Sequence, residues 1–238
     1  MRGRDRQIRF AFAPDPPRVR RSGADEATKK EKRGKRRGPK PSSRPPTPHR
    51  ARPAHPGWKP VHVTLRARRL LPSLRTQLVL KLLRAIVADP RREAFRVVHW
   101  SIQSDHVHLI VEAKDRETLE WGVRSLVIRM ARRLNGLLDR HGPVWGDRYH
   151  RRDVATPTEV RTLLLYVLAN ARKHERVAHG ARWIDPFSSA LAFDGWERAF
   201  RAEYAERAPP HLAPHTWLLR VGWKQRWGPI RFDEAPRA

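Results

Sequence analysis

Apolar and polar residues alternate in three short stretches of the chain, and each stretch predicts a β-strand. Residues 59–69 contain VHVTLR, with Val, Val and Leu on one face and His, Thr and Arg on the other. Residues 94–103 (AFRVVHWSIQ) predict a second strand, and residues 106–113 (HVHLIVEA) a third. The Ser-Asp pair at 104–105 is short enough to join the last two strands as an antiparallel hairpin.

Longer stretches repeat their apolar residues with the spacing of an amphipathic helix. Residues 75–89 place Leu78, Leu82, Leu83 and Ile86 at that spacing, and Pro90 ends the pattern. Residues 118–138 predict a long helix with Leu119, Val123, Met130 and Leu134 on one stripe.

A third helix is predicted to begin at residue 156 and to run to about residue 177. Thr156 is suited to the N-cap, Pro157 to the first helical position and Glu159 to the third. The stretch before it, 141–155, opens with a Gly-Pro turn and can end in a strand. The resulting order of strand, helix, strand, strand, helix, strand, helix predicts an α+β fold. We expect a ferredoxin-like or RRM-like central antiparallel sheet with packed helices.

Two groups of residues within these elements suggest chemistry. His106 and His108 are two residues apart in a strand, so both imidazoles lie on the same face. Tyr166 and Asn170 are four residues apart in the third predicted helix, and His174 continues their polar stripe. Each group also has an ordinary explanation, because histidine is common in half-buried strands and a polar stripe can face solvent or the sheet edge.

Taken together, the two groups fit a metal-assisted reaction at a phosphate. His106, His108 and the amide oxygen of Asn170 would make a three-ligand metal site with open positions. Tyr166, one helical turn from Asn170, could attack a phosphodiester that such a metal polarises. Ligand softness alone would favour zinc at a site with two imidazoles.

The charge of the chain indicates a polyanionic partner. The 238 residues carry a formal net charge of +27, with a pI near 11.7. Nucleic acid is the first candidate, and its binding should weaken steeply with salt. Cysteine is absent, which excludes disulfides, thiolate metal sites and a cysteine nucleophile. No apolar run approaches the roughly 18 residues of a membrane span, so we expect a cytoplasmic protein.

The positive charge is densest at the N-terminus. Residues 1–60 hold 19 Lys and Arg against 5 Asp and Glu, together with 11 of the 21 prolines. Such a composition cannot form a core, so residues 1–57 are expected to be a disordered basic arm. Within it, KRRGPKP at 35–41 is similar to a minor-groove AT-hook without the Arg-Gly-Arg-Pro core, and is equally typical of a solvated linker.

The C-terminal residues 181–238 form a third region, rich in tryptophan and arginine. Aromatic side chains among basic residues can stack on unpaired bases, but they can also anchor an extension onto a domain. Both interpretations stay open for five tryptophans: Trp183, Trp196, Trp217, Trp223 and Trp227.

Three segments between residues 59 and 180 resemble one known family. SDHVHLIVEA resembles the His-hydrophobic-His motif of HUH single-strand DNA endonucleases. GPVWGDRYHRRDVATPTEVRTLLLYVLANARKH resembles the second half of single-tyrosine transposases, especially the REP-associated tyrosine transposases, and PVHVTLRAR resembles their first strand. The resemblance implies a catalytic domain at 58–180 with the α+β fold derived above. It also implies a bacterial protein of the cytoplasm, associated with the nucleoid when bound to DNA.

The resemblance further implies an activity and its residues. The family cleaves and rejoins single-stranded DNA at hairpin-flanked sites through a 5′-phosphotyrosine, with Mg²⁺ or Mn²⁺. Tyr166 matches the nucleophile, His106 and His108 match the metal ligands, and Asn170 matches the residue that completes the metal site. The partner would be single-stranded or hairpin DNA, bound by a monomer or a homodimer without any membrane. One departure is Ala171, where the family often has proline, so we expect the helix to continue there.

Several alternatives remain at this point. Tyr149 and Tyr204 are rival nucleophiles without a polar helix partner four residues on. A domesticated protein of the same fold would bind hairpin DNA or RNA without cleavage, and a phosphodiesterase would use water instead of tyrosine. Some basic side chains are candidates to line the DNA path, although each is also typical of a solvated charge: Arg148, Arg151, Arg152 and Lys173.

Overall fold

The structure, a computed structural model, describes residues 52–88, 94–171, 183–197, 212–231 and 234. The chain divides into two units, 1–50 and 51–238, and all the described residues belong to the second. The AT-hook-like stretch 35–41, Lys173, His174 and Tyr204 lie outside the described residues.

A four-stranded antiparallel sheet forms the centre of the described unit, in the order β2-β3-β1-β4. Its strands are β1 (Val61–Arg66), β2 (Phe95–Ile102), β3 (His106–Ala113) and β4 (His150–Asp153). Helix α1 (Gln77–Val87) lies between β1 and β2 in the sequence, and α2 (Arg116–Leu137) lies between β3 and β4. Helix α3 (Pro157–Leu168) follows β4. The α+β fold with a ferredoxin-like central sheet is therefore confirmed, including the hairpin between β2 and β3.

Each of the three helices begins after an N-cap residue whose side chain accepts a hydrogen bond from the first turn. Thr76 accepts a hydrogen bond from the backbone N–H of Val79, and Asp115 accepts one from that of Thr118. At α3 the predicted capping box is complete, because Thr156 and Glu159 each accept a hydrogen bond from the other's backbone N–H. The start of α3 is thus determined locally, and it lies directly after β4.

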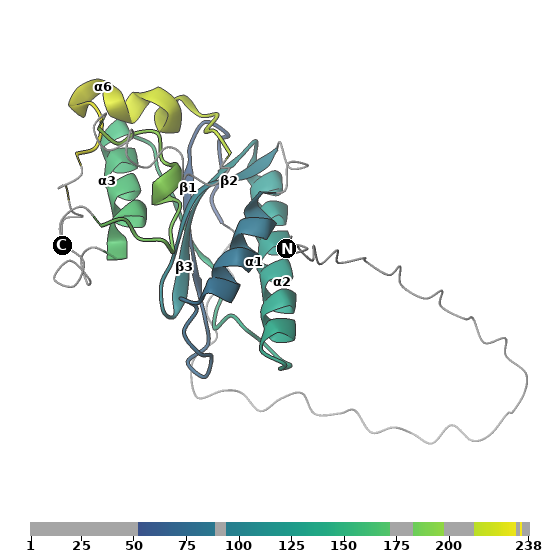
Figure 1. Cartoon of the computed structure of the whole chain (residues 1–238). Coiled ribbons are helices and arrows are strands. Elements are labelled where there is room, and N and C mark those ends of the chain that lie inside the picture. The colour runs from purple at the N-terminus through teal and green to yellow at the C-terminus, as the bar shows by residue number, and fades with distance from the viewer. Residues whose placement is uncertain (1–51, 89–93, 172–182, 198–211, 232–233, 235–238) are drawn as a thin grey trace, which may run out of the picture. The chain divides into compact units, whose positions relative to one another are not determined.

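Helices α1 and α2 cover one face of the sheet, and α3 covers the other together with the C-terminal segments (Figure 1). The α1–α2 face buries the alternating apolar residues of β1 and β3, such as Val63 and Leu109. In α1 the buried stripe is Val79, Leu80, Leu83 and Ile86, while Leu78, predicted to be in the stripe, is exposed. An apolar run such as QLVLKLL offers more than one stripe, and packing against the sheet and α2 selects among them.

The C-terminal segments complete the core on the α3 face. They include η1 (Ala190–Ala192), the π-helix η3 (Leu218–Gly222) and α6 (Trp223–Trp227). Trp196 and Trp223 are buried in this core, and their indole N–H groups donate to the carbonyls of Ala190 and Leu219. Trp217 and Trp227 are exposed. The two interpretations of the tryptophans therefore apply to different residues: Trp196 and Trp223 anchor the extension, and Trp217 and Trp227 are available to a partner.

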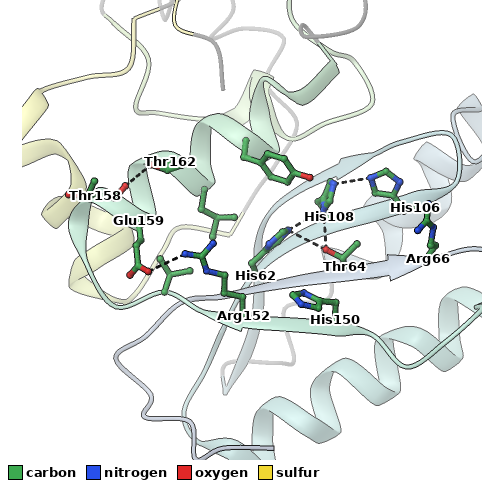
Figure 2. A pocket seen from close by; sticks show the side chains of 13 residues that line it. His62, Thr64, Arg66, His106, His108, His150, Arg152, Thr158, Glu159 and Thr162 are labelled. Carbon is green, nitrogen blue, oxygen red and sulfur yellow. Dashed lines mark hydrogen bonds and ion pairs between the residues drawn. The ribbon is translucent and has the colours of Figure 1, made fainter. Parts of the chain in front are cut away.

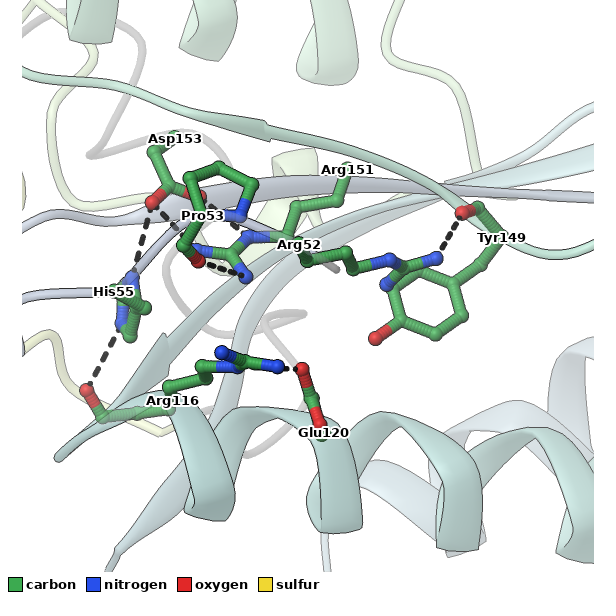
Figure 3. Close-up of polar contacts among 9 residues, drawn as sticks. Arg52, Pro53, His55, Arg116, Glu120, Tyr149, Arg151 and Asp153 are labelled. Carbon is green, nitrogen blue, oxygen red and sulfur yellow. Dashed lines mark hydrogen bonds and ion pairs between the residues drawn. The ribbon is translucent and has the colours of Figure 1, made fainter. Parts of the chain in front are cut away.

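Described residues that precede the predicted start of the domain at 58 contact the rest of their unit (Figure 3). The Arg52 guanidinium stacks 3.6 Å from the ring centre of Tyr149 and donates to its carbonyl oxygen. His55 lies 3.3 Å from a carboxylate oxygen of Asp153 and 3.2 Å from the carbonyl oxygen of Ala113. The disordered arm at 1–57 that composition indicates stays a prediction.

Within the described residues, no helix has the length and apolar character needed to cross a bilayer.

Candidate active site

A cavity of about 630 Å³ opens between the sheet and α3 (Figure 2). Strands β1, β3 and β4 supply its floor, and one face of α3 supplies its wall. The lining residues are His62, Thr64, Arg66, His106, His108, His150, Arg152, Val154, Thr158, Glu159, Thr162, Leu163 and Tyr166.

Sheet register brings the polar side chains of three strands together on this floor. Thr64 of β1 is paired with His108 on β3 and with His150 on β4. Arg66 is paired with His106. Because alternate residues of a strand share a face, the cavity side chains of each strand are two residues apart, as in His106 and His108.

The two histidines predicted as metal ligands meet directly. The Nε2 atoms of His106 and His108 are 2.9 Å apart. The Nδ1–H of His106 donates to the Asp105 carboxylate at 2.6 Å, which leaves a lone pair on Nε2 of the neutral ring. The carboxylate therefore sets both the tautomer and the orientation of His106.

Two possible hydrogen-bond acceptors lie near Nδ1, the other ring nitrogen of His108. Its Nδ1 lies 3.1 Å from His62 Nε2 and 3.2 Å from the Thr64 hydroxyl. Donation of Nδ1–H to either one leaves a lone pair on Nε2 of His108, facing that of His106. Two lone pairs at this distance repel each other unless a cation or a proton lies between them.

Burial keeps two of these rings neutral. The pKa of His108 is lowered to about 3 by desolvation and then by the neighbouring His106 and His62. The pKa of His62 is lowered to about 4 by desolvation and then by the charges of His150 and Arg152. Neutral imidazole is also the form of histidine that binds metal ions.

The geometry of the His106–His108 pair fits a divalent cation. Two nitrogens bound to one ion at about 2.1 Å and at a right angle stand about 3 Å apart. Mg²⁺ and similar ions keep several waters and use few protein ligands together with substrate phosphates. Among the described residues, no group of three or more His, Cys, Asp or Glu could hold a metal ion. A divalent ion at this site would therefore take the rest of its ligands from water or substrate.

Tyr166 is the described tyrosine that faces these histidines. It projects from α3 into the cavity with 38 % of its surface exposed. The centre of its ring lies 5.0 Å from that of His108 and 5.8 Å from that of His62. Tyr149 instead packs against the core of the α1–α2 face, beneath Arg52, so the sheet separates it from the cavity.

The structure places Asn170 apart from this group. Helix α3 ends at Leu168, where the cap residue Ala169 has φ −112° and ψ 11°. Asn170 and Ala171 are helical again, so the helix that was expected to continue at Ala171 is interrupted at Ala169. Asn170 is buried beyond this break and is not among the residues that line the cavity. Its role as a metal ligand stays a prediction.

His62 and Thr64 are site residues that the sequence analysis did not select. Both were assigned to the polar face of a strand, but the sequence carries no sign that this strand pairs with the His106–His108 strand in this register. Of the basic candidates, Arg152 lines the cavity, whereas Arg151 forms a two-bond ion pair with Asp153, whose carboxylate also contacts His55. Arg148 is exposed outside the cavity lining.

Comparisons with known proteins give structural neighbours only. No protein-family model matches the chain, and no curated protein matches it. The structure is similar to that of a REP-associated tyrosine transposase bound to a REP hairpin, with a TM-score of 0.48 and 20 % identity over 71 % of this chain and 93 % of that one. It is also similar to a putative transposase from Deinococcus radiodurans, with a TM-score of 0.35 and 19 % identity over 51 % of this chain and 92 % of that one.

Proposed function

We propose that the chain is a DNA strand transferase of the REP-associated tyrosine transposase type, acting on single-stranded DNA beside hairpins. The observation that carries the proposal is the meeting of three side chains in one cavity. The Nε2 atoms of His106 and His108 are 2.9 Å apart, and the Tyr166 ring lies against His108. A cation-binding pair next to an accessible phenol is the arrangement needed for nucleophilic attack on a phosphodiester.

In the proposed reaction the hydroxyl oxygen of Tyr166 attacks the scissile phosphorus. A bond forms between this oxygen and phosphorus, and the bond from phosphorus to the 3′ oxygen breaks. The phenolic proton ends on the leaving oxygen, so the products are a 5′-phosphotyrosine and a free 3′-hydroxyl. Attack by a 3′-hydroxyl in the reverse direction rejoins the strand without water or ATP.

His106 and His108 would hold Mg²⁺ or Mn²⁺, which supplies a Lewis acid that polarises a phosphate oxygen. The chain's own cations add to this effect. Arg66, whose exposed guanidinium lies 3.2 Å from Asp105, lines the same cavity beside His106. Phosphate oxygens can replace such an exposed partner, and a guanidinium there stabilises the extra negative charge of the transition state.

The test is covalent capture on a denaturing gel. Labelled hairpin oligonucleotides from the DNA flanking the gene are mixed with protein and Mn²⁺ or Mg²⁺. We expect a slowly migrating covalent band that needs the metal and disappears in Tyr166→Phe. Tyr149→Phe is the matched control, because this tyrosine lies on the other face of the sheet, and it should keep the band.

The rival functions give different results in the same experiment. Cleavage that survives Tyr166→Phe without a covalent band would identify water as the nucleophile. Hairpin binding that is insensitive to chelation, with no cleavage in any lane, would identify a non-catalytic binding protein.

A further inference from the structure

The outer side of α2, on the face of the sheet opposite the cavity, exposes large apolar side chains. On this side Trp121 is 62 % exposed and Ile128 is 40 % exposed. Neither belongs to the apolar stripe by which α2 packs into the core, which consists of Leu119, Val123, Leu126, Met130 and Leu134. Exposed apolar side chains that lie close together on one element are typical of an interaction surface.

The exposed apolar residues alternate with arginines along one side of the helix. Trp121, Arg124, Ile128 and Arg132 are three or four residues apart, and all four are exposed. Residues at this spacing lie above one another on a helix, so the four side chains form a stripe of three turns, about 16 Å long. We call these four residues the α2 stripe.

The positive charge of this part of α2 has no compensating carboxylate. From residue 121 to residue 138 the sequence contains four arginines and neither Asp nor Glu. Within the part of the chain that the structure describes, neither Arg124 nor Arg132 forms an ion pair. In the first turns of α2, by contrast, Arg116 lies 3.0 Å from the carboxylate of Glu120, the usual i,i+4 pairing of a solvated helix.

One arginine of the stripe also contacts its tryptophan. The guanidinium carbon of Arg124 lies 5.6 Å from the centre of the Trp121 ring, within the range of a cation–π contact. This contact limits the freedom of both side chains before any partner binds. Tryptophan and arginine are also the residue types that contribute most binding energy at protein interfaces.

Two kinds of acidic partner would suit the arginines, and the apolar side chains distinguish between them. A DNA backbone neutralises guanidinium groups, but its phosphates and sugars leave Ile128 and much of Trp121 in polar surroundings. An amphipathic helix covers both apolar side chains with its own apolar residues, and its flanking carboxylates pair with the arginines. The composition of the stripe therefore favours a protein partner.

We propose that the α2 stripe is a docking surface for an acidic amphipathic helix of another protein. Apolar side chains of that helix pack against Trp121 and Ile128, and its carboxylates face Arg124 and Arg132. Helix α2 covers the face of the sheet opposite α3, so docking leaves the cavity open (Figure 1). This binding goes beyond the proposed reaction at Tyr166 and does not depend on it.

Fluorescence anisotropy with two labelled peptides tests this docking surface on the full chain. The first probe has about 18 residues, five helical turns, with leucine along one side and glutamate elsewhere. The second replaces every leucine by alanine and keeps the charge, so it measures attraction by charge alone. We expect the leucine probe to bind about tenfold more tightly than the alanine probe.

Two substitutions in the stripe should change this result in different ways. Trp121→Ala should abolish the tenfold preference, because it removes the largest apolar contact. Arg132→Gln should weaken binding of the leucine probe about threefold, because it removes one exposed charge. Trp217→Ala is the matched control, since it removes a similarly exposed indole from the C-terminal segments, and it should keep the full preference.

Three results would overturn the proposal. The first is equal affinity of the wild type for the two probes, and the second is a leucine preference that survives Trp121→Ala. The third is weaker binding of a DNA duplex by Trp121→Ala and Arg132→Gln with no change for the leucine probe, which would identify a nucleic-acid surface. The covalent gel is independent of these outcomes, because Trp121→Ala should form the Tyr166 adduct at the rate of the wild type.

Discussion

The two faces of the sheet come from the same strands but differ in how completely other elements cover them. In β3, Val107, Leu109 and Val111 point into a continuous apolar core beneath α1 and α2. In the same strand His106 and His108 point to the other face, which borders the 630 Å³ cavity beside α3. One face is closed by two helices, and the other is closed only in part, by one helix and the C-terminal segments.

This difference shows how a small fold can separate stability from chemistry. The alternation of a strand places a side chain of the candidate site and a core side chain next to each other in sequence and on opposite sides of the sheet. Substitutions at neighbouring positions should therefore affect different properties of the protein. The predictions below test this separation.

The largest expected effect is on the α3 face, at His106. His106→Ala should lower the rate of covalent adduct formation about a thousandfold, because a Lewis acid contributes several kcal/mol to such a step. The free energy of unfolding should change by no more than about 1 kcal/mol, since the ring is partly exposed. His141→Ala, an exposed histidine outside the cavity lining, should leave the rate unchanged.

On the opposite face, Leu109→Ala should lower the stability of the protein and leave the rate of adduct formation unchanged. Leu109 is fully buried, and its truncation should cost about 3 kcal/mol in the free energy of unfolding, measured in urea. The adduct rate of the molecules that remain folded should stay near that of the wild type. A loss of rate in the folded fraction would show that the two faces are coupled.

A smaller effect is expected at His62, whose Nε2 atom lies 3.1 Å from Nδ1 of His108, one of the two proposed metal ligands. His62→Ala removes one of the two acceptors near Nδ1 of His108 and should weaken Mn²⁺ binding by about tenfold in calorimetry. His62→Gln supplies an amide oxygen as acceptor and should restore most of the affinity. Equal affinities in His62→Ala and wild type would contradict an orienting role.

The smallest expected effect is the change in the free energy of unfolding with pH, which differs between the two faces of the sheet. In the folded state the pKa values of His62 and His108 are about 4 and 3, against about 6.5 in an unfolded chain. Below pH 6.5 the unfolded state therefore takes up more protons, and stability falls with falling pH. Each ring should cost about 1 kcal/mol between pH 7.5 and 5.5 in metal-free protein.

On the other face the sensitive group is Asp153. Burial acts to raise its pKa, but hydrogen bonds from Arg151 and His55 outweigh burial and lower it. Its stabilisation is present above the unfolded value of about 3.9 and is lost as pH falls below it. The free energy of unfolding in urea, measured across pH, should fall in two pH ranges, one below about 6.5 from the histidines and one below about 3.9 from Asp153. His62→Gln should reduce only the fall in the higher range. A flat stability between pH 7.5 and 5 would contradict the assignment.

Local signals in the sequence predicted most elements of the fold. Alternation identified β1, β2 and β3, and the Thr156–Glu159 capping box identified the start of α3. Two local predictions were incomplete, because the bulge between Val97 and His99 and the end of α3 at Leu168 leave no clear mark in the residues. Both features depend on how the segment packs against its neighbours.

For the site, the sequence by itself determined which side chains share a strand face. His106 and His108 must point to one side because the strand repeats every two residues, and this follows from backbone geometry alone. Only the tertiary structure decided what they meet there. Pairing of β1 with β3 brings Thr64 and His62, which precede His108 by 44 and 46 residues, to Nδ1 of His108.

The same distinction explains Asn170, Tyr166 and the tryptophans. Spacing predicts that Tyr166 and Asn170 share a helix face, but α3 ends between them, so that only Tyr166 lines the cavity. Composition marks the C-terminal tryptophans without separating buried Trp223 from exposed Trp217. Periodicity is a property of neighbouring residues, whereas register, helix ends and burial depend on contacts between distant ones, which one sequence does not specify locally.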